Sequence, residues 1–280
     1  MGAFYDEIPD NVVDWIKEQK MFWVASAPLS ATGTVNVSPK GYDSFNIVSP
    51  TQVWYLDGTG SGNETISHMR EKGNGRLTIM FNAFTGPPRI LRLFGHGRVL
   101  ERDTPEFNKL LPPGDGRRFA GARAIVWLDI ERVGTSCGYS VPYYHYEGER
   151  DRLIKFFETK EAVDREFLDA QLASPDPLDP SITLAPADVK NSMRAYWKLK
   201  NAESVDGLPG LEAAGWPPEE GAIRKSRKGI AEAFARKSAG GMTALKAREG
   251  LEWLRGRDWR VEAALVVGIL SGIYIGREYL

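Results

Sequence analysis

The best candidates for chemistry in this chain are three polar side chains that share one face of a short strand. Side chains alternate along a strand, so Asn36, Ser38 and Lys40 point one way while Val37 points the other. An amide, a hydroxyl and an ammonium group in one row suit a phosphate or the carbonyl edge of a flavin ring. The alternative is a solvated polar face, and Pro39 favours a sheet edge because it cannot donate to a β-ladder.

A glycine-rich stretch, residues 58–62, leads into a helix predicted over residues 64–72. The first N–H groups of a helix have no partner inside the helix and favour an anion. The glutamate that opens this helix would repel a phosphate unless its carboxylate faces away. The alternative is an ordinary flexible turn with an N-cap. The hydroxyl and amide groups available at this entrance belong to Ser61, Asn63 and Thr65.

Two arginines lie three residues apart on the strand predicted over residues 89–101. On a regular strand Arg89 and Arg92 face opposite sides, so a single pocket within one subunit cannot use both. Arg92 shares its face with apolar neighbours, and a charge in such surroundings needs a partner. That partner is either a cofactor phosphate or flavin edge, or an acidic side chain such as Asp43 or Glu101. A site between two subunits would let each arginine meet a different cleft.

Composition excludes several kinds of chemistry. With one cysteine and three scattered histidines, the 280 residues offer no intrachain disulfide, no cysteine zinc site and no histidine pair at metal-ligand spacing. No G-x-S-x-G hydrolase motif occurs. We interpret Cys137 as a buried, inert thiol. A net charge of −1 gives no reason to expect nucleic acid as a partner. No set of catalytic side chains is identifiable, so a cofactor would carry any reaction.

The elements that must position these groups are mainly strands. Six runs rich in β-branched and aromatic residues, with few helices between them, predict a six-stranded antiparallel barrel in a mainly β (α+β) fold with flanking helices. One helix is predicted over residues 11–19 with Asp10 as its cap, and another begins near Pro105 with Thr104 as its cap. The predicted strands cover residues 21–27, 34–40, 52–57, 76–83, 89–101 and 124–133.

Beyond the barrel the sequence becomes helical. Apolar stripes predict helices over residues 149–172 and 187–199, so the chain carries a helical C-terminal extension. We therefore expect three parts: a barrel domain over residues 1–147, the extension over 148–212, and a basic region with an apolar C-terminal helix over 213–280.

The last part contains two contrasting segments. Residues 224–260 carry 11 Lys and Arg against 4 Asp and Glu, and residues 263–276 carry no charge. The uncharged run is shorter than the roughly 20 residues that span a bilayer, so we favour a helix packed on the protein's own surface. A C-terminal membrane anchor is the alternative, because a basic segment suits a cytosolic membrane face. Without a secretory signal at the N-terminus, we expect an intracellular, cytoplasmic protein.

Taken in order, these motifs resemble the pyridoxamine 5′-phosphate oxidase-like family of FMN-binding split barrels. The resemblance covers residues 15–133 and rests on N-V-S-P-K-G, V-W-Y-L-D, S-G-N-E-T and R-I-L-R-L-F-G-H-G-R-V. The later segments S-C-G-Y-S-V-P and K-N-A-E-S-V-D-G-L-P-G-L resemble a largely fungal branch of the family. The resemblance implies a split β-barrel, a homodimer, and one FMN in each of two clefts at the subunit interface.

The resemblance also implies which residues would contact the cofactor. The strand that meets the flavin ring and phosphate corresponds to residues 37–41, with Lys40 as the cation. The phosphate grip of the family falls on residues 61–65, where hydroxyls and backbone N–H groups replace its basic pair. The family's Gln-Val-Arg strand keeps only its arginine, Arg92. The implied cofactor-binding residues are Asn36, Val37, Ser38, Lys40, Gly41, Tyr55, Leu56, Ser61, Asn63, Thr65 and Arg92.

The sequence indicates less about the reaction than about the cofactor. The tryptophan-rich, arginine-bearing ending of true pyridoxamine phosphate oxidases is absent, so the resemblance does not extend to vitamin B6 chemistry. We expect an FMN-dependent oxidoreductase that acts on a small-molecule substrate. The alternatives are a non-catalytic flavin-binding protein, for storage, sensing or assembly, and a structural dimer whose cofactor site has decayed.

Overall fold

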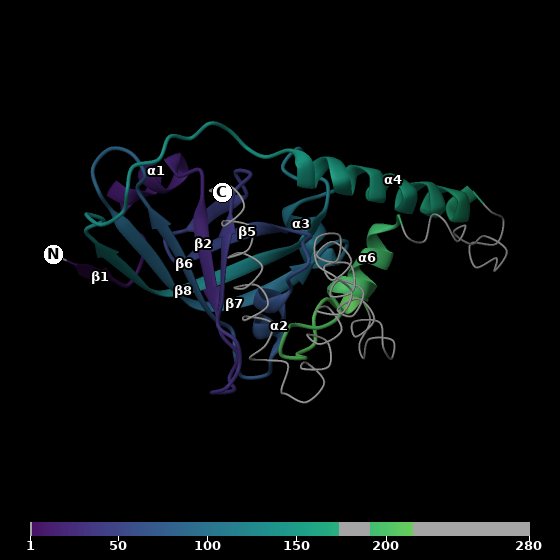
Figure 1. Ribbon diagram of the computed structural model, residues 1–280, viewed down its shortest axis with the longest axis horizontal. Helices are drawn as coiled ribbons and strands as arrows, with labels where there is room; N and C mark the ends of the chain where they lie inside the picture. Colours follow the sequence, from purple (N-terminus) through teal and green to yellow (C-terminus); the bar gives the residue numbers. More distant parts are fainter. Residues whose placement is uncertain (1, 174–190, 215–280) are drawn as a thin grey trace, which may run out of the picture. The chain divides into compact units, whose positions relative to one another are not determined.

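The computed structural model describes residues 2–173 and 191–214, which lie within one compact unit of the chain (Figure 1). The basic segment over residues 224–260 and the uncharged run over 263–276 lie outside the described residues, and the expected three-part division stays a prediction. Within the two described ranges, no helix combines the length and the apolar composition that crossing a bilayer requires.

The strands form one antiparallel sheet in the order β3-β2-β6-β7-β8-β5-β4, with β1 paired to β8. The prediction of a mainly β, antiparallel split barrel with flanking helices is confirmed. All six predicted strands are present, and β1 and β4 are added; β1, with three residues, is too short for the alternation of side chains to reveal it. The strands are β1 (Ala3–Tyr5), β2 (Phe22–Ser26), β3 (Asn36–Lys40), β4 (Phe45–Ser49), β5 (Gln52–Gly58), β6 (Arg76–Asn82), β7 (Ile90–Glu101) and β8 (Ala122–Ser136).

The longest strand, β8, is the spine of the sheet and is covered on both faces. Val126 and Leu128 point into the core of the barrel, while Ile125 and Trp127 point into a second apolar cluster that includes Phe107. Burial on both faces explains why this strand reads as an almost continuous apolar run rather than an alternating one. A charge within such a run is therefore an exception that needs a structural reason.

Helix α1 (Asp10–Glu18) packs against the core of the barrel. Val12 and Ile16, four residues apart, lie on one face of the helix and are buried with the strand residues. The predicted cap is wrong by one residue: Asp10 is the first helical residue, and Pro9 occupies the N-cap position without a side-chain hydrogen bond. The fixed φ of proline serves the helix start in place of a polar cap.

The remaining helices follow the predicted pattern with shifted ends. In α3, the Thr104 hydroxyl accepts a hydrogen bond from the Phe107 N–H, as predicted. The helix predicted from residue 187 is described from Met193, where the Ser192 hydroxyl caps it by accepting from the Ala195 N–H. The bounds are α2 (Glu64–Arg70), α3 (Pro105–Leu110), α4 (Arg152–Ala173), α6 (Met193–Lys200) and a 3₁₀ turn, η1 (Glu212–Ala214).

Cys137 follows the end of β8 and is exposed. The interpretation of this residue as a buried thiol is therefore wrong. The strand ends at Ser136, and the chain that follows runs over the surface, where Tyr139 is also exposed. The absence of a nearby base in the sequence, on which that interpretation rested, says nothing about burial.

Helix α4 packs against the chain at Gly121, just before the start of β8. Gly121 has a φ of +81°, and a Cβ there would lie 2.6 Å from Cβ of Phe157 on α4. Its N–H donates to Glu161 Oε1 at 2.6 Å, and Arg102 pairs with the same carboxylate. Both the backbone conformation and the close approach of the helix require glycine at this position. The contact fixes the chain at the start of β8, and Gly121 lies two residues before Arg123.

We predict that Gly121→Ala destabilises the fold by about 3 kcal/mol, because a left-handed φ and an overpacked contact each cost about 1–2 kcal/mol. Gly114→Ala is the matched control, since Gly114 also has a positive φ of +86° but has open space around a Cβ. The control should lose only about 1 kcal/mol. Urea unfolding of the full chain measures both, and equal losses would contradict tight packing of Phe157 on Gly121.

Candidate functional site

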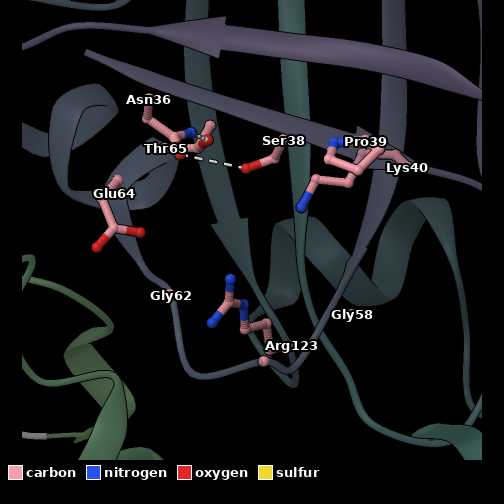
Figure 2. Close-up of a pocket in the computed structure, with 10 residues that line it drawn as sticks. Asn36, Ser38, Pro39, Lys40, Gly58, Gly62, Glu64, Thr65 and Arg123 are labelled. Carbon is pink, nitrogen blue, oxygen red and sulfur yellow. Dashed lines mark hydrogen bonds between the residues drawn. The ribbon is translucent and has the colours of Figure 1, made fainter. Parts of the chain in front are cut away.

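A pocket of about 260 Å³ opens where β3, the end of β5, the start of α2 and β8 come together (Figure 2). The polar row of β3 lies along one side of it. The glycine-rich loop after β5 forms another side, and one arginine enters from β8. The lining residues are Asn36, Ser38, Pro39, Lys40, Gly58, Gly60, Gly62, Glu64, Thr65 and Arg123. The structure thus brings the polar strand and the glycine-rich helix entrance into one pocket.

A buried carboxylate organises the charges of the pocket. Asp57 is 1% exposed, and its two oxygens accept from Lys40 Nζ at 2.6 Å and from Arg123 Nε at 2.8 Å. Burial by itself raises the pKa of the Asp57 carboxyl, but the charges of Arg123 and Lys40 outweigh it, so this pKa lies below its ordinary value. Asp57 is therefore ionised at neutral pH and holds both cations at the pocket.

Arg123 keeps unused hydrogen-bonding capacity. The residue is 5% exposed, and while Nε is bonded to Asp57, one of its terminal nitrogens is buried without a partner. Figure 2 shows the guanidinium group pointing into the pocket. An unpaired buried donor on a charged group is costly, so an arrangement of this kind is typical of a site that an anion completes.

The opposite side of the pocket supplies a chain of neutral groups. Ser38 Oγ donates to Asn36 Oδ1 at 3.2 Å, and Asn36 Nδ2 donates to Thr65 Oγ1 at 2.9 Å. These bonds fix the row of β3 against the first turn of α2, as the dashed lines in Figure 2 show. The pocket therefore combines two cations with two hydroxyls and an amide.

The entrance to α2 differs from the prediction. Glu64 Oε2 accepts from the Asn63 N–H at 2.9 Å, so a carboxylate of the chain itself occupies part of the expected anion seat. The Asn63 side chain is buried and donates to Ser67 Oγ, pointing away from the pocket. Ser61 is exposed and does not line the pocket. Of the three groups predicted at this entrance, Thr65 alone reaches the pocket.

Tyr55, Leu56 and Gly41 lie around the pocket without lining it. Tyr55 is fully buried next to Asp57, its ring centroid 5.8 Å from Lys40 Nζ. Burial, and then the Asp57 carboxylate, raise the pKa of Tyr55 well above its ordinary value, so its hydroxyl stays protonated. Leu56 points to the other face of β5, where it lines a separate hollow of about 510 Å³ with Trp54.

Arg92 lies on the face of the sheet opposite to Lys40. Lys40 pairs with Phe22 on β2, whereas Arg92 pairs with Met80, which pairs with Trp23. Phe22 and Trp23 are adjacent and point in opposite directions. Arg92 donates to Ser136 Oγ at 3.3 Å and not to Asp43 or Glu101. Val37, also on the outer face, is 60% exposed. Arg92 therefore cannot join the pocket of its own chain.

The sequence reasoning missed the two residues that define the site, Asp57 and Arg123. Only Asp57 carried a readable signal, since it has the same parity on its strand as the inward-facing Val53 and Tyr55. By alternation Arg123 belongs with Ile125 and Trp127 on the other face of β8. A register shift in the pairing of β5 with β8 skips Arg123, so strand alternation does not predict its contact with Asp57. What the sequence does not contain is the pairing of β5 with β8 that brings them within reach.

No group of three or more His, Cys, Asp and Glu side chains that could hold a metal ion occurs in the part of the chain that the structure describes. His68 is buried against Ser26, with Nδ1 and Oγ 2.9 Å apart, and burial lowers its pKa. His96 pairs with Glu131 on the surface. These histidines belong to separate places in the fold.

Comparison with known proteins places this site in a family. A family model described as pyridoxamine 5′-phosphate oxidase matches residues 8–137. The pyridoxamine 5′-phosphate oxidase family protein ustO of Aspergillus flavus is 37% identical over 228 residues, which are 76% of this chain and 80% of the relative.

Two solved structures illustrate more distant similarity. HupZ of Group A Streptococcus is 19% identical, with a TM-score of 0.36 over 45% of this chain and 91% of that chain. The FAD binding protein of Mycobacterium smegmatis is 11% identical, with a TM-score of 0.32 over 47% and 97%. On the extent and identity of its match to the Aspergillus flavus relative, this chain belongs to the pyridoxamine 5′-phosphate oxidase family.

Proposed function

We propose that this protein binds FMN through the pocket at Lys40 and Arg123 and uses it as an oxidoreductase on a small-molecule substrate. The observation that carries the proposal is the buried terminal nitrogen of Arg123, which has no partner and stands beside a second cation. A phosphate group would satisfy it with a charge-assisted hydrogen bond. The donor set of the pocket therefore fits the phosphorylated end of the flavin that the family resemblance implies.

The side chains divide the work of holding the cofactor. Lys40 and Arg123 provide two positive charges, and Asp57 offsets one of them while fixing both in place. The Glu64 carboxylate also lines the pocket, so it must turn away from a phosphate bound there. Ser38 and Thr65 add hydroxyl groups that can turn toward a phosphate oxygen. The polar face of β3 leads away from this end and offers its backbone and side chains to the rest of the cofactor.

Bound FMN supplies electron or hydride transfer, which no side chain of this pocket can provide. The residues of the chain bind and orient. The Tyr55 hydroxyl stays protonated, and Tyr55 lies in the core without lining the pocket, so it offers no base to a bound substrate. No described residue of the pocket forms a nucleophile–base pair, which fits a site where the protein positions a reactive cofactor.

We further propose that the complete site lies between two copies of the chain. Arg92 and the exposed Val37 share the outer face of the sheet, away from the pocket of the same chain. An arginine on that face can serve a flavin only in the cleft of another subunit. The exposed apolar side chain of Val37, on the same face, suits a subunit interface.

The direct test is the purified full-length protein. We expect it to show the visible absorbance bands of a flavin, and mass spectrometry of the released molecule to identify FMN. A colourless protein that does not bind added FMN would contradict the proposal. Reduction of bound FMN by NAD(P)H and reoxidation by a substrate would separate an enzyme from a protein that binds flavin without catalysis.

We predict that Arg123→Lys weakens FMN binding about tenfold or more, because a hydrogen bond to a charged group contributes about 1.5–3 kcal/mol. The variant keeps the charge beside Asp57 and removes the spare donor. Binding of riboflavin, which has no phosphate, should weaken less. Fluorescence titration with both flavins measures the difference. Arg98→Lys is the control, since Arg98 is half-exposed, pairs with Asp129 and does not line the pocket; equal weakening of both flavins by Arg123→Lys would contradict a phosphate contact.

We predict that Lys40→Ala and Arg92→Ala each weaken FMN binding, and that mixing the two variants restores half of the sites. A mixed dimer has one cleft with both substitutions and one with neither, if Lys40 and Arg92 reach a cleft from different subunits. Co-expression with two affinity tags isolates the mixed dimer, and flavin content per dimer gives the result. A mixed dimer with no tight site would show that both residues serve the same chain's site.

A further inference from the structure

The glycine-rich loop that borders the pocket is held from behind by the helical extension. Trp197 Nε1 on α6 donates to Thr59 Oγ1 at 3.0 Å, and Asn201 Nδ2 donates to the Gly60 carbonyl at 2.9 Å. The side chains of Trp197, Asn201 and Thr59 are buried. Thr59 turns toward the extension, whereas Gly58 and Gly60 on either side of it line the pocket.

The extension is itself anchored to the barrel close to the pocket. The buried Glu101 accepts from the N–H groups of Glu212 at 2.6 Å and Ala213 at 3.0 Å, and it pairs with Arg70 of α2. In the segment between α6 and η1, Asp206 accepts from the N–H and hydroxyl of Thr34, two residues before β3. The segment is thereby tied to both elements that flank the pocket, α2 and β3.

The barrel holds only one end of the loop. Gly58 still belongs to β5, and the Thr59 N–H donates to the Gly121 carbonyl at 2.7 Å. Glycine has the largest conformational freedom of any residue, and the loop alternates glycine at positions 58, 60 and 62. A Cβ at Gly60 would meet no atom within 4 Å. The hydrogen bonds from the extension to the Thr59 side chain and the Gly60 carbonyl therefore hold the part of the loop that lies beyond the barrel.

We propose that Trp197 and Asn201 are positioning residues for the phosphate end of the pocket, acting through Thr59 and Gly60. The inference rests on the proposed function, and it assigns the extension a role in selecting the phosphorylated flavin. Neither residue lines the pocket. Their effect is to hold the loop in the shape that leaves room for an anion beside Arg123.

The experiment compares Trp197→Phe, Thr59→Val and the double variant, each as full-length protein, by titration with FMN and with riboflavin. Each single variant removes one partner of the same hydrogen bond. We expect FMN binding to weaken about fivefold, from the usual net contribution of a hydrogen bond, and riboflavin binding to change less. The double variant should lose no more than either single variant, because both remove one interaction.

Trp127→Phe is the matched control. Trp127 is also a buried tryptophan whose Nε1 donates a hydrogen bond, in this case to Asp129 at 3.0 Å, and it lies in the apolar cluster outside the pocket. It should lower the melting temperature without changing the ratio of FMN to riboflavin affinity. If Trp197→Phe behaves in the same way, its role is structural and the inference is overturned. If the wild-type protein binds neither flavin, the proposed function fails and the inference fails with it.

Discussion

The site depends on the two ion pairs that the buried Asp57 carboxylate makes with Lys40 and Arg123. The sheet runs from β3 at one end to β5 and β4 at the other, so β3 and β5 are not hydrogen-bonded neighbours. The Lys40–Asp57 bond crosses this gap, and the Arg123–Asp57 bond joins the same point to β8. A buried carboxylate requires both partners, since removing one leaves an uncompensated charge. The same bonds that bridge the open side of the barrel therefore also set the two cations of the pocket.

Elements outside the pocket hold the residues around Asp57 in place. The polar row of β3 and the first turn of α2 are joined by the hydrogen bonds of Asn36. Behind them, α4 fixes the start of β8 at Gly121, and the segment after α6 holds the glycine-rich loop. Helix α2 contributes Glu64 and Thr65 to the pocket itself, whereas no described residue of α4 or α6 lines it.

Much of the fold was readable from the sequence, because the six predicted strands are rich in β-branched and aromatic residues and helix α3 carries the capping residue Thr104. The polar row of β3 was also readable, since period-two geometry fixes which side chains share a face. The site was only partly readable. Arg123 and Asp57 are 66 residues apart, and their contact follows from strand pairing, which no local pattern encodes. The Glu64 carboxylate accepts from the Asn63 N–H at the start of its own helix. This depends on the rotamer of Glu64, which sequence spacing does not determine.

The length of chain between these contacts has a consequence for how the protein matures. The groups that form and support the pocket extend from Asn36 on β3 to Asn201 after α6, and the bond between Thr34 and Asp206 joins residues 172 positions apart. Contacts between residues so far apart in the sequence form late in folding. Closing a long loop costs conformational entropy before the contact can stabilise the fold. During synthesis the barrel strands emerge well before the extension that supports the glycine-rich loop. Ligand capture by this pocket is thus expected to follow, and not to guide, the assembly of the barrel.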